Sequence, residues 1–593
     1  MGGGLLNIVA YGNQNVILNG NPSKTFFKTV YAKYTNFGIQ KFRIDFEGSR
    51  SLNEETDSVY TFKIPRHGDL LLDTYLAFNL PDIYSAILPP LTKGDIWKPY
   101  HFKWIENIGT SIIKNIKIMI GTNIIQEYNG EYIRCVVERD FSEAKKRTFD
   151  IMTGNTEEFN GPEFFGGRRL NNYPNVFYNP SITGSEPSIR GRKIYVPLNP
   201  WYMNDSKVAL PLICLQYSEL TVEITLRPIK EIFTINNING INIVSNIDTQ
   251  SNNDTPDENT GEFTSYNYNL DYEKNIDKLY DRKRPNFSNE NEQMYNYLEQ
   301  APTIELDRND YQNKENNWNA DVHLIANMCF LTKEESNIFA NNEQKILIKD
   351  IKYTTFYNIT GSARVKLDTN ALVSSWLWFY RRNDIYSRNE WSNYTNWKTR
   401  YIPYDLLDGE EITPFTVDNA LTGIGPGRDY NILTDDVNQR LVTNHQITPN
   451  FSIQNTKKIL NTFSIVIDGK YRENELDSGI YEHLEKYRSS NGCSSDLGIY
   501  SYNFCINTGV NNLQPSGAMN LSRFKNIELE MTTLVPESDP TSRTTTLCDE
   551  DGGIIGVIDS ESLYLYNYEM HLYEERYNIL RIMSGNAGLL FAR

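Results

Sequence analysis

Short runs that alternate between apolar and polar residues recur along the chain, separated by Gly, Asn, Asp and Pro. Apolar side chains occupy every second position of residues 41–47, and residues 219–226 and 526–531 repeat this pattern. A period of two is typical of a strand that has one face in a core and the other in water. The three segments therefore predict strands of antiparallel sheets.

Helical periodicity is sparse. Residues 116–120 and 124–125 read as two strands joined by the Gly-Thr-Asn turn at 121–123, which predicts a hairpin. Helix-like spacing appears near residues 131–144 and 479–488, and these segments are expected to be short helices in loops. Strands without alternating helices indicate a sandwich or a barrel and not a parallel sheet with helical crossovers.

Two stretches of the chain echo each other. Residues 327–331 are followed by Glu334-Glu335, and residues 569–573 are followed by Glu574-Glu575. We interpret each segment as a strand that ends at a pair of acidic residues. Matching strands lie upstream, at 220–226 in one half and 527–534 in the other. Two similar β domains in tandem would produce this echo, and chance is the alternative because the match is short and gapped.

Length and charge narrow the class of protein. A chain of 593 residues exceeds the size at which one hydrophobic core stops growing, so at least two domains are expected. Hydrophobic residues make up 39% and aromatic residues 12%, which supplies material for cores and favours strands. The net charge of −17 has the wrong sign for binding phosphates, so the sequence argues against a nucleic-acid partner.

The residues that usually carry chemistry are scattered. The six cysteines form no CxxC pair, so buried reduced thiols are expected, and the six histidines lack the spacing of metal ligands. No apolar run is long enough for a spanning helix and no signal peptide is recognisable, which predicts a protein made in the cytosol. We predict no enzyme and name no catalytic, cofactor-binding or metal-ligating residue and no cofactor. The cysteines are Cys135, Cys214, Cys329, Cys493, Cys505 and Cys548, and the histidines are His67, His101, His323, His445, His483 and His571.

Several local features receive a structural interpretation. Pro426 within residues 423–427 removes a backbone donor and no Lys-Ser follows, so this glycine-rich stretch is expected to be a turn and not a phosphate loop. Residues 549–553 form an acidic turn without the ligand spacing of a calcium loop. His571 is expected at a solvated or hydrogen-bonded surface position, on the strand face opposite Met570 and Leu572.

One aromatic cluster leaves two interpretations open. Residues 376–380 contain two tryptophans, a phenylalanine and a tyrosine, followed by Arg381-Arg382. Such a cluster could stack bases or sugars, but a strand that ends in a basic turn explains it as core and edge, which we favour. The candidates are Trp376, Trp378, Phe379 and Tyr380.

Four motifs resemble one known family. They are NPSKTFFKTVY at 21–31, LPLICLQY at 210–217, QPSG at 514–517 with Asn520 and Ser522-Arg523 behind it, and YNILRIMSG at 577–585. Together they span nearly the whole chain in the order found in the major capsid proteins of nucleocytoplasmic large DNA viruses. The chain resembles that family, and within it the mimivirus-type giant-virus proteins.

The resemblance implies an all-β fold of two tandem eight-stranded antiparallel jelly rolls with short loop helices. The expected domains are an N-terminal arm at 1–30, jelly roll 1 at 31–340 with an Asn-rich surface insertion at about 235–319, and jelly roll 2 at 341–593. Gly2-Gly3-Gly4 predicts a flexible start of the arm, and Leu5-Leu6 predicts that an apolar stretch ordered by neighbouring molecules follows it. Because its composition cannot bury a core, the insertion is expected to be an exposed loop.

The resemblance also implies a function. Three copies would form a pseudo-hexagonal capsomer of an icosahedral virion shell, assembled in the host cytoplasm. The implied partners are further copies, neighbouring capsomers, minor capsid and penton proteins, and an internal viral membrane on the N-terminal side, without nucleic acid. The alternatives are a β-sandwich carbohydrate-binding protein and a minor capsid or fibre component.

Overall fold

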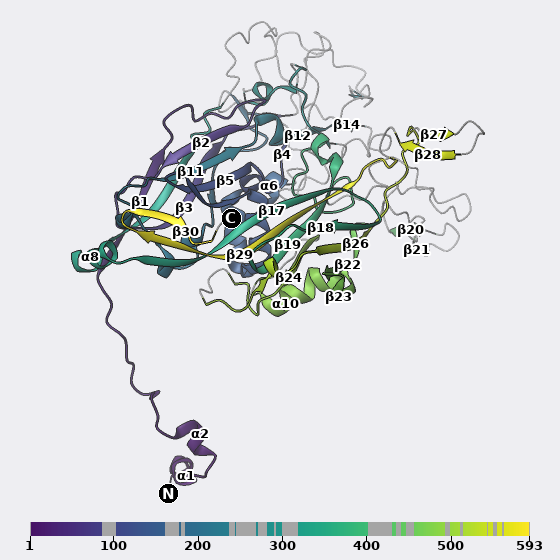
Figure 1. Cartoon of the computed structure of the whole chain (residues 1–593). Coiled ribbons are helices and arrows are strands. Elements are labelled where there is room, and N and C mark those ends of the chain that lie inside the picture. Colours follow the sequence, from purple (N-terminus) through teal and green to yellow (C-terminus); the bar gives the residue numbers. More distant parts are fainter. Residues whose placement is uncertain are drawn as a thin grey trace.

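Strands dominate the computed structural model. It describes residues 2–85, 102–160, 177–179, 184–236, 243–244, 269–270, 282–289, 292–298, 318–400, 430–434, 441–445, 456–490, 492, 498–509, 514–542, 544–548, 554–559 and 563–591. Four large sheets are built from antiparallel pairs, two in each half of the chain. The two halves lie side by side (Figure 1).

The first half contains two sheets that face each other. Their strand orders are β1-β16-β3-β9 and β2-β11-β5-β6, and β10 also pairs with β3. Along β11 every second residue is buried, as the alternation in the sequence predicted. The strands are β1 (Phe37–Asp45), β2 (Ser58–Lys63), β3 (Leu70–Leu80), β5 (Ile113–Ile120), β6 (Asn123–Tyr128), β9 (Arg192–Pro197), β10 (Leu210–Pro211), β11 (Leu220–Leu226) and β16 (His323–Leu331).

The second half repeats this arrangement. Its sheets have the orders β17-β29-β19-β24 and β18-β26-β22-β23, and β25 and β30 add short pairs to β19 and β29. The strands are β17 (Gln344–Ile359), β18 (Ser362–Lys366), β19 (Leu372–Arg382), β22 (Leu460–Ile467), β23 (Lys470–Asp477), β24 (Ile499–Asn503), β25 (Met519–Asn520), β26 (Ile527–Thr533), β29 (Tyr568–Met583) and β30 (Asn586–Leu589).

Both halves share one topology. If the eight main strands of each half are counted in chain order, each half has one sheet of order 1-8-3-6 and one of order 2-7-4-5. This is the double-sheet arrangement of a jelly roll. The echo in the sequence is therefore confirmed, because β16 and β29 are both eighth strands and β11 and β26 are both seventh strands. We call the two units jelly roll 1 and jelly roll 2.

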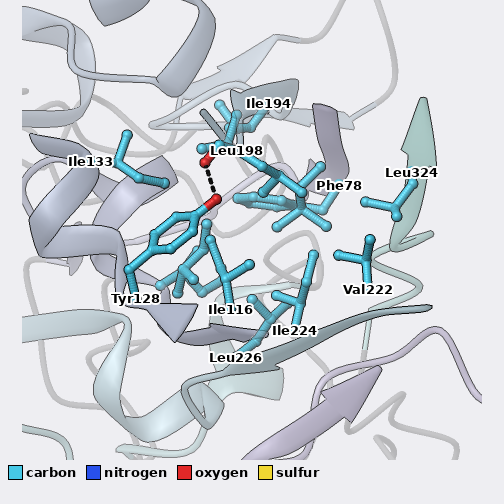
Figure 2. Packing of buried hydrophobic residues seen from close by; sticks show 14 of the residues in the cluster. Phe78, Ile116, Tyr128, Ile133, Ile194, Leu198, Val222, Ile224, Leu226 and Leu324 are labelled. Atoms are coloured by element: carbon cyan, nitrogen blue, oxygen red, sulfur yellow. Dashed lines mark hydrogen bonds between the residues drawn. The ribbon is translucent and has the colours of Figure 1, made fainter. Parts of the chain in front are cut away.

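The core of jelly roll 1 lies between its two sheets. Figure 2 shows apolar side chains from both sheets meeting there, joined by Ile133 from a helix, and the Tyr128 hydroxyl donates a hydrogen bond of 2.6 Å to the Leu198 carbonyl. One sheet contributes Ile116, Val222, Ile224 and Leu226, and the other contributes Phe78, Ile194 and Leu324. Jelly roll 2 has a second core of its own, in which aromatic residues predominate.

The helices are short and lie in the connections between strands. The segments predicted near 131–144 and 479–488 are both helical, which confirms these two predictions. The helices are α3 (Ile108–Ser111), α4 (Gly130–Asp140), α5 (Glu143–Thr153), α6 (Glu157–Asn160), α8 (Lys333–Asn341), the π-helix η10 (Ile480–Leu484) and α10 (Glu485–Ser489), with short 3-10 turns η1 (Trp201–Met203), η2 (Ser206–Val208), η3 (Leu212–Cys214), η4 (Ile229–Glu231), η6 (Met294–Tyr297), η8 (Asn383–Ser387) and η11 (Leu521–Arg523).

The insertion at 235–319 is not wholly an exposed loop. Within its described residues, the side chains of Phe287, Met294 and Tyr297 are buried in the core of jelly roll 1. The sequence hid this because Met294 and Tyr297 lie in a single short 3-10 turn and Phe287 lies outside any helix or strand, so no periodicity marks them. Smaller strands complete the structure: β4 (Phe102–Trp104), β7 (Phe177–Asn179), β8 (Gly184–Glu186), β12 (Phe233–Asn236), β13 (Ile243–Val244), β14 (Asn269–Leu270), β15 (Arg282–Lys283), β20 (Tyr430–Thr434), β21 (Leu441–His445), β27 (Thr544–Cys548) and β28 (Ile554–Asp559).

The N-terminal segment extends away from both jelly rolls (Figure 1). None of residues 2–36 is buried, and they contain two short helices, α1 (Gly3–Val9) and α2 (Asn15–Asn19). Gly3 and Gly4 lie in the first turn of α1, and the flexibility of this stretch stays a prediction. We call residues 2–36 the arm.

Candidate functional site: the seam between the two jelly rolls

Strands β19 and β29 are buried on both faces. Their inner face, which carries Trp376, Trp378 and Tyr380, belongs to the core of jelly roll 2. Their outer face packs against jelly roll 1, so that Leu377 and Phe379 belong to the core that also fills jelly roll 1. We call this contact the seam. It joins the two jelly rolls through side chains that a single sandwich would leave in water.

Helix α4 of jelly roll 1 fills the seam. All eleven of its residues are buried, although five of them are charged. The Asn129 side chain caps the helix by accepting a hydrogen bond of 2.9 Å from the Tyr132 amide. A Cβ at Gly130 would lie only 1.9 Å from the Thr110 carbonyl oxygen, so only glycine allows the helix to begin this close to α3.

Glu575 on β29 is the centre of one charged cluster in the seam. One carboxylate oxygen accepts hydrogen bonds of 2.8 Å from the Arg139 guanidinium and 2.9 Å from the Tyr132 hydroxyl, both on α4. The other oxygen accepts a bond of 2.6 Å from Ser375 and lies 3.5 Å from the Lys349 ammonium. Burial alone would raise the pKa of this carboxyl, but Arg139 and Lys349 outweigh it and lower the pKa to about 2.

A second charged cluster lies nearer the start of α4. The Arg381 guanidinium donates a hydrogen bond of 2.5 Å to Glu131, and the Arg227 guanidinium lies 4.0 Å from the same carboxylate. Burial opposes the charge on Glu131, but the attraction of Arg381 and of neighbouring cations lowers its pKa. The carboxylates of both clusters are paired with guanidinium or ammonium groups. The start and the end of α4 can therefore be buried without leaving an isolated charge there.

His571 lies beside this second cluster. The expectation of a surface position is wrong, because the side chain is 3% exposed and its ring stacks between Tyr353 and Phe379. The hydrogen bond that was the other part of this expectation is present, because His571 Nδ1 lies 2.6 Å from the Tyr353 hydroxyl. Burial and the nearby Arg381 lower its pKa. The prediction that His571 faces away from Met570 and Leu572 was correct. The opposite face meets jelly roll 1, and the sequence of one strand could not reveal that second layer.

Two further sequence interpretations change at this place. The pair Glu574-Glu575 does not mark the end of a strand, because β29 continues to Met583 and both residues are buried. The aromatic residues before Arg381-Arg382 are core residues, as favoured. The two arginines, however, are buried within central strand β19 and do not form an exposed basic edge.

The pKa of Glu574 is shifted in the opposite direction to that of Glu575. It points to the inner face of the sheet opposite Trp376, and burial raises its pKa. A carboxyl whose pKa is raised on folding stabilises the protein below its ordinary pKa, and this stability is lost as pH rises through the folded pKa. Unfolding of Glu574→Gln, measured in urea at a series of pH values, should give a stability gain over the wild type that widens above pH 4.5. A gain that narrows as pH rises would contradict this.

The seam encloses little empty space. The cavity beside Arg139 and Glu575 has a volume of about 30 Å³, which suits a water molecule and not a substrate. Among the described residues, no three His, Cys, Asp or Glu side chains are grouped to hold a metal ion, and no helix is long and apolar enough to span a bilayer. Cys135, Cys214, Cys329 and Cys505 are free and buried.

The remaining sequence candidates cannot be placed. The glycine-rich stretch at 423–427 and the acidic turn at 549–553 lie outside the described residues. The structure thus brings together residues that the sequence did not single out, among them Glu131, Arg139 and Glu575. The sequence contained two signals of this cluster: the five charged residues of the α4 segment and the three consecutive charged residues of the β29 segment. Either feature alone is usual for a solvated surface.

Comparison with known proteins is consistent with this architecture. A family model of the major capsid protein N-terminus matches residues 25–268, and a model of the large eukaryotic DNA virus major capsid protein matches residues 335–588. The major capsid protein of Phaeocystis pouchetii virus is 22% identical over 100% of both chains. Probable capsid protein 4 of Acanthamoeba polyphaga mimivirus is 22% identical and covers 90% of this chain and 93% of its own length.

A solved structure shares the fold. The PBCV-1 virus capsid chain is 18% identical, covers 96% of this chain and 100% of its own length, and superposes with a TM-score of 0.54. The fold and the seam therefore define a protein made of two fused jelly rolls. The chain belongs to the major capsid proteins of large eukaryotic DNA viruses, which form the icosahedral capsid. The resemblance found in the sequence is confirmed.

Proposed function

We propose that three copies of this chain form a pseudo-hexagonal capsomer and that these capsomers tile the icosahedral shell. The observation that supports this is the seam, because it holds two jelly rolls of the same topology side by side in one chain. Three such chains around a threefold axis place six similar jelly rolls in a ring. Because the ring is closed, no subunit interface is left unpaired. The chain is inferred to be structural and not catalytic.

The units of this capsomer follow the divisions predicted from the sequence. We propose three units: an N-terminal unit at 1–30, which contains most of the arm, jelly roll 1 at 31–340 and jelly roll 2 at 341–593. In support, none of residues 2–36 is buried, and the strands of the second unit begin with β17 at Gln344. The proposed partners are further copies, minor capsid and penton proteins, and the internal membrane on the N-terminal side. Assembly is proposed to occur in the host cytoplasm.

Native mass and negative-stain images of the purified full chain test this proposal. We expect a trimer with a hexagonal outline. A stable monomer at all concentrations would overturn it and would favour the β-sandwich carbohydrate-binding alternative, which sugar-binding titrations would then examine. A trimer present in only a few copies per virion would instead favour a minor capsid or fibre component.

A further inference from the structure

The arm exposes more apolar surface than a free segment in water normally does. Its helices leave Ile17 and Leu18 more than four-fifths exposed, and the extended part leaves the Phe27 ring 99% exposed. Exposed apolar groups gathered in this way usually mark a binding surface. The exposed set is Leu5, Leu6, Ile8, Val9, Tyr11, Val16, Ile17, Leu18, Phe26, Phe27, Val30, Tyr31 and Tyr34.

The arm is also basic, in contrast to the rest of the chain. The first 36 residues contain Lys24, Lys28 and Lys33 and no acidic residue, so the rest of the chain carries −20 against a total of −17. The lysines alternate with aromatic residues, and the Lys24 ammonium lies 5.1 Å from the centroid of the Phe26 ring. Cationic and aromatic groups are therefore presented together on one short segment.

We propose that the arm binds the surface of an anionic lipid bilayer. The three lysines would pair with lipid headgroups, while the aromatic rings and the apolar residues of α1 and α2 would enter the boundary between headgroups and acyl chains. Charge complementarity favours this occupant over a neutral apolar groove, which would give the lysines no counterpart. The acidic body of a second copy would also give them one, and the deletion of residues 2–36 distinguishes it from the bilayer. This inference rests on the membrane partner in the proposed function and identifies the residues and the lipid class.

The length of the arm allows it to reach an anionic bilayer although the rest of the chain is acidic. An anionic bilayer repels a body of charge −20, but the repulsion decays over about 8 Å at physiological salt. The extended residues 20–36 can span up to roughly 55 Å. The structure shows the two helices well away from the jelly rolls (Figure 1). The arm can therefore contact the lipid while the acidic body stays beyond the range of the repulsion.

Co-flotation of the full chain with vesicles tests the inference. The vesicles contain phosphatidylcholine alone or with phosphatidylserine at about one lipid in three, a content that gives a strongly anionic surface. We expect binding to the phosphatidylserine vesicles, weaker binding as salt is raised, and little binding to phosphatidylcholine alone. The combined change Lys24→Gln, Lys28→Gln and Lys33→Gln should weaken binding on the order of 100-fold.

Two matched variants separate the contributions. The change Lys63→Gln, Lys345→Gln and Lys470→Gln removes the same charge from exposed positions on the jelly rolls and should leave binding unchanged. The change Phe26→Ser and Phe27→Ser keeps the charge and should weaken binding at every salt concentration. Because the arm buries no residue against the body, both arm variants should keep the native mass of the wild type.

The outcomes distinguish this inference from the capsomer proposal. If trimers form but the arm lysine variant binds vesicles as the wild type does, the lipid inference is wrong and the capsomer proposal stands. If deletion of residues 2–36 abolishes self-association without lipid, the occupant is a second copy of the chain, and the inference is also wrong. If no trimer forms, the capsomer proposal fails, and the vesicle assay still decides whether the arm binds lipid.

Discussion

Glu575→Leu should destabilise the protein by about 3–5 kcal/mol, because it removes one of the two carboxylates that pair with the buried Arg139 guanidinium. The Arg139 side chain is fully buried, and its remaining carboxylate contact is with Asp140, the next residue in the chain. The substitution also removes the acceptor of the Tyr132 and Ser375 hydroxyls. Urea unfolding of the purified chain, followed by tryptophan fluorescence and by circular dichroism, measures the loss.

Two controls identify the cause of that loss. The triple variant Arg139→Met, Asp140→Asn and Glu575→Leu removes the buried charges together, so that Asp140 is not left without Arg139, and should recover much of the stability, since such exchanges are often neutral. Lys63→Met breaks an exposed pair with Glu219 at 3.5 Å and should change stability by less than about 0.5 kcal/mol. A Glu575→Leu loss no larger than that of Lys63→Met would show that the seam does not depend on this pair.

Trp378→Ala should destabilise jelly roll 2 by about 3–5 kcal/mol. The Trp378 side chain, on β19, is fully buried, and its ring stacks on Phe463 of the opposite sheet with centroids 4.7 Å apart and on Tyr500 at 5.7 Å. Removal of the ring leaves a cavity between the two sheets and takes away a contact that joins them. Chemical denaturation, monitored by circular dichroism, gives the change in unfolding free energy.

The size of the residue should matter more than its chemistry at this position. Trp378→Phe keeps an aromatic ring in the stack and should lose much less stability than Trp378→Ala. Tyr487→Ala removes a ring that is 92% exposed and should change stability by less than about 0.5 kcal/mol. Equal losses for Trp378→Phe and Trp378→Ala would argue that indole contacts, and not the filled volume, stabilise the core.

The sequence determined the strands of each jelly roll. Along β11 and β26 one face meets a core and the other meets solvent or partly buried polar groups, and the alternation is complete in both. Local period and turn residues suffice in such strands because each side chain has one of two environments. The echo between the halves likewise identified equivalent strands, since equal positions in a repeated fold impose equal patterns.

The seam was decided only by tertiary structure. β19 is buried on both faces and loses the alternation, and α4 carries charges that resemble those of a solvated helix. Two of these charges, Glu131 and Arg139, are tolerated in the interior because Arg381 and Glu575, which lie hundreds of residues away in the chain, pair with them. The sequence therefore determined two tandem β domains, and the family resemblance implied that they are jelly rolls. Three-dimensional packing alone decided which polar faces became an interface, because pairing energies depend on distance in space.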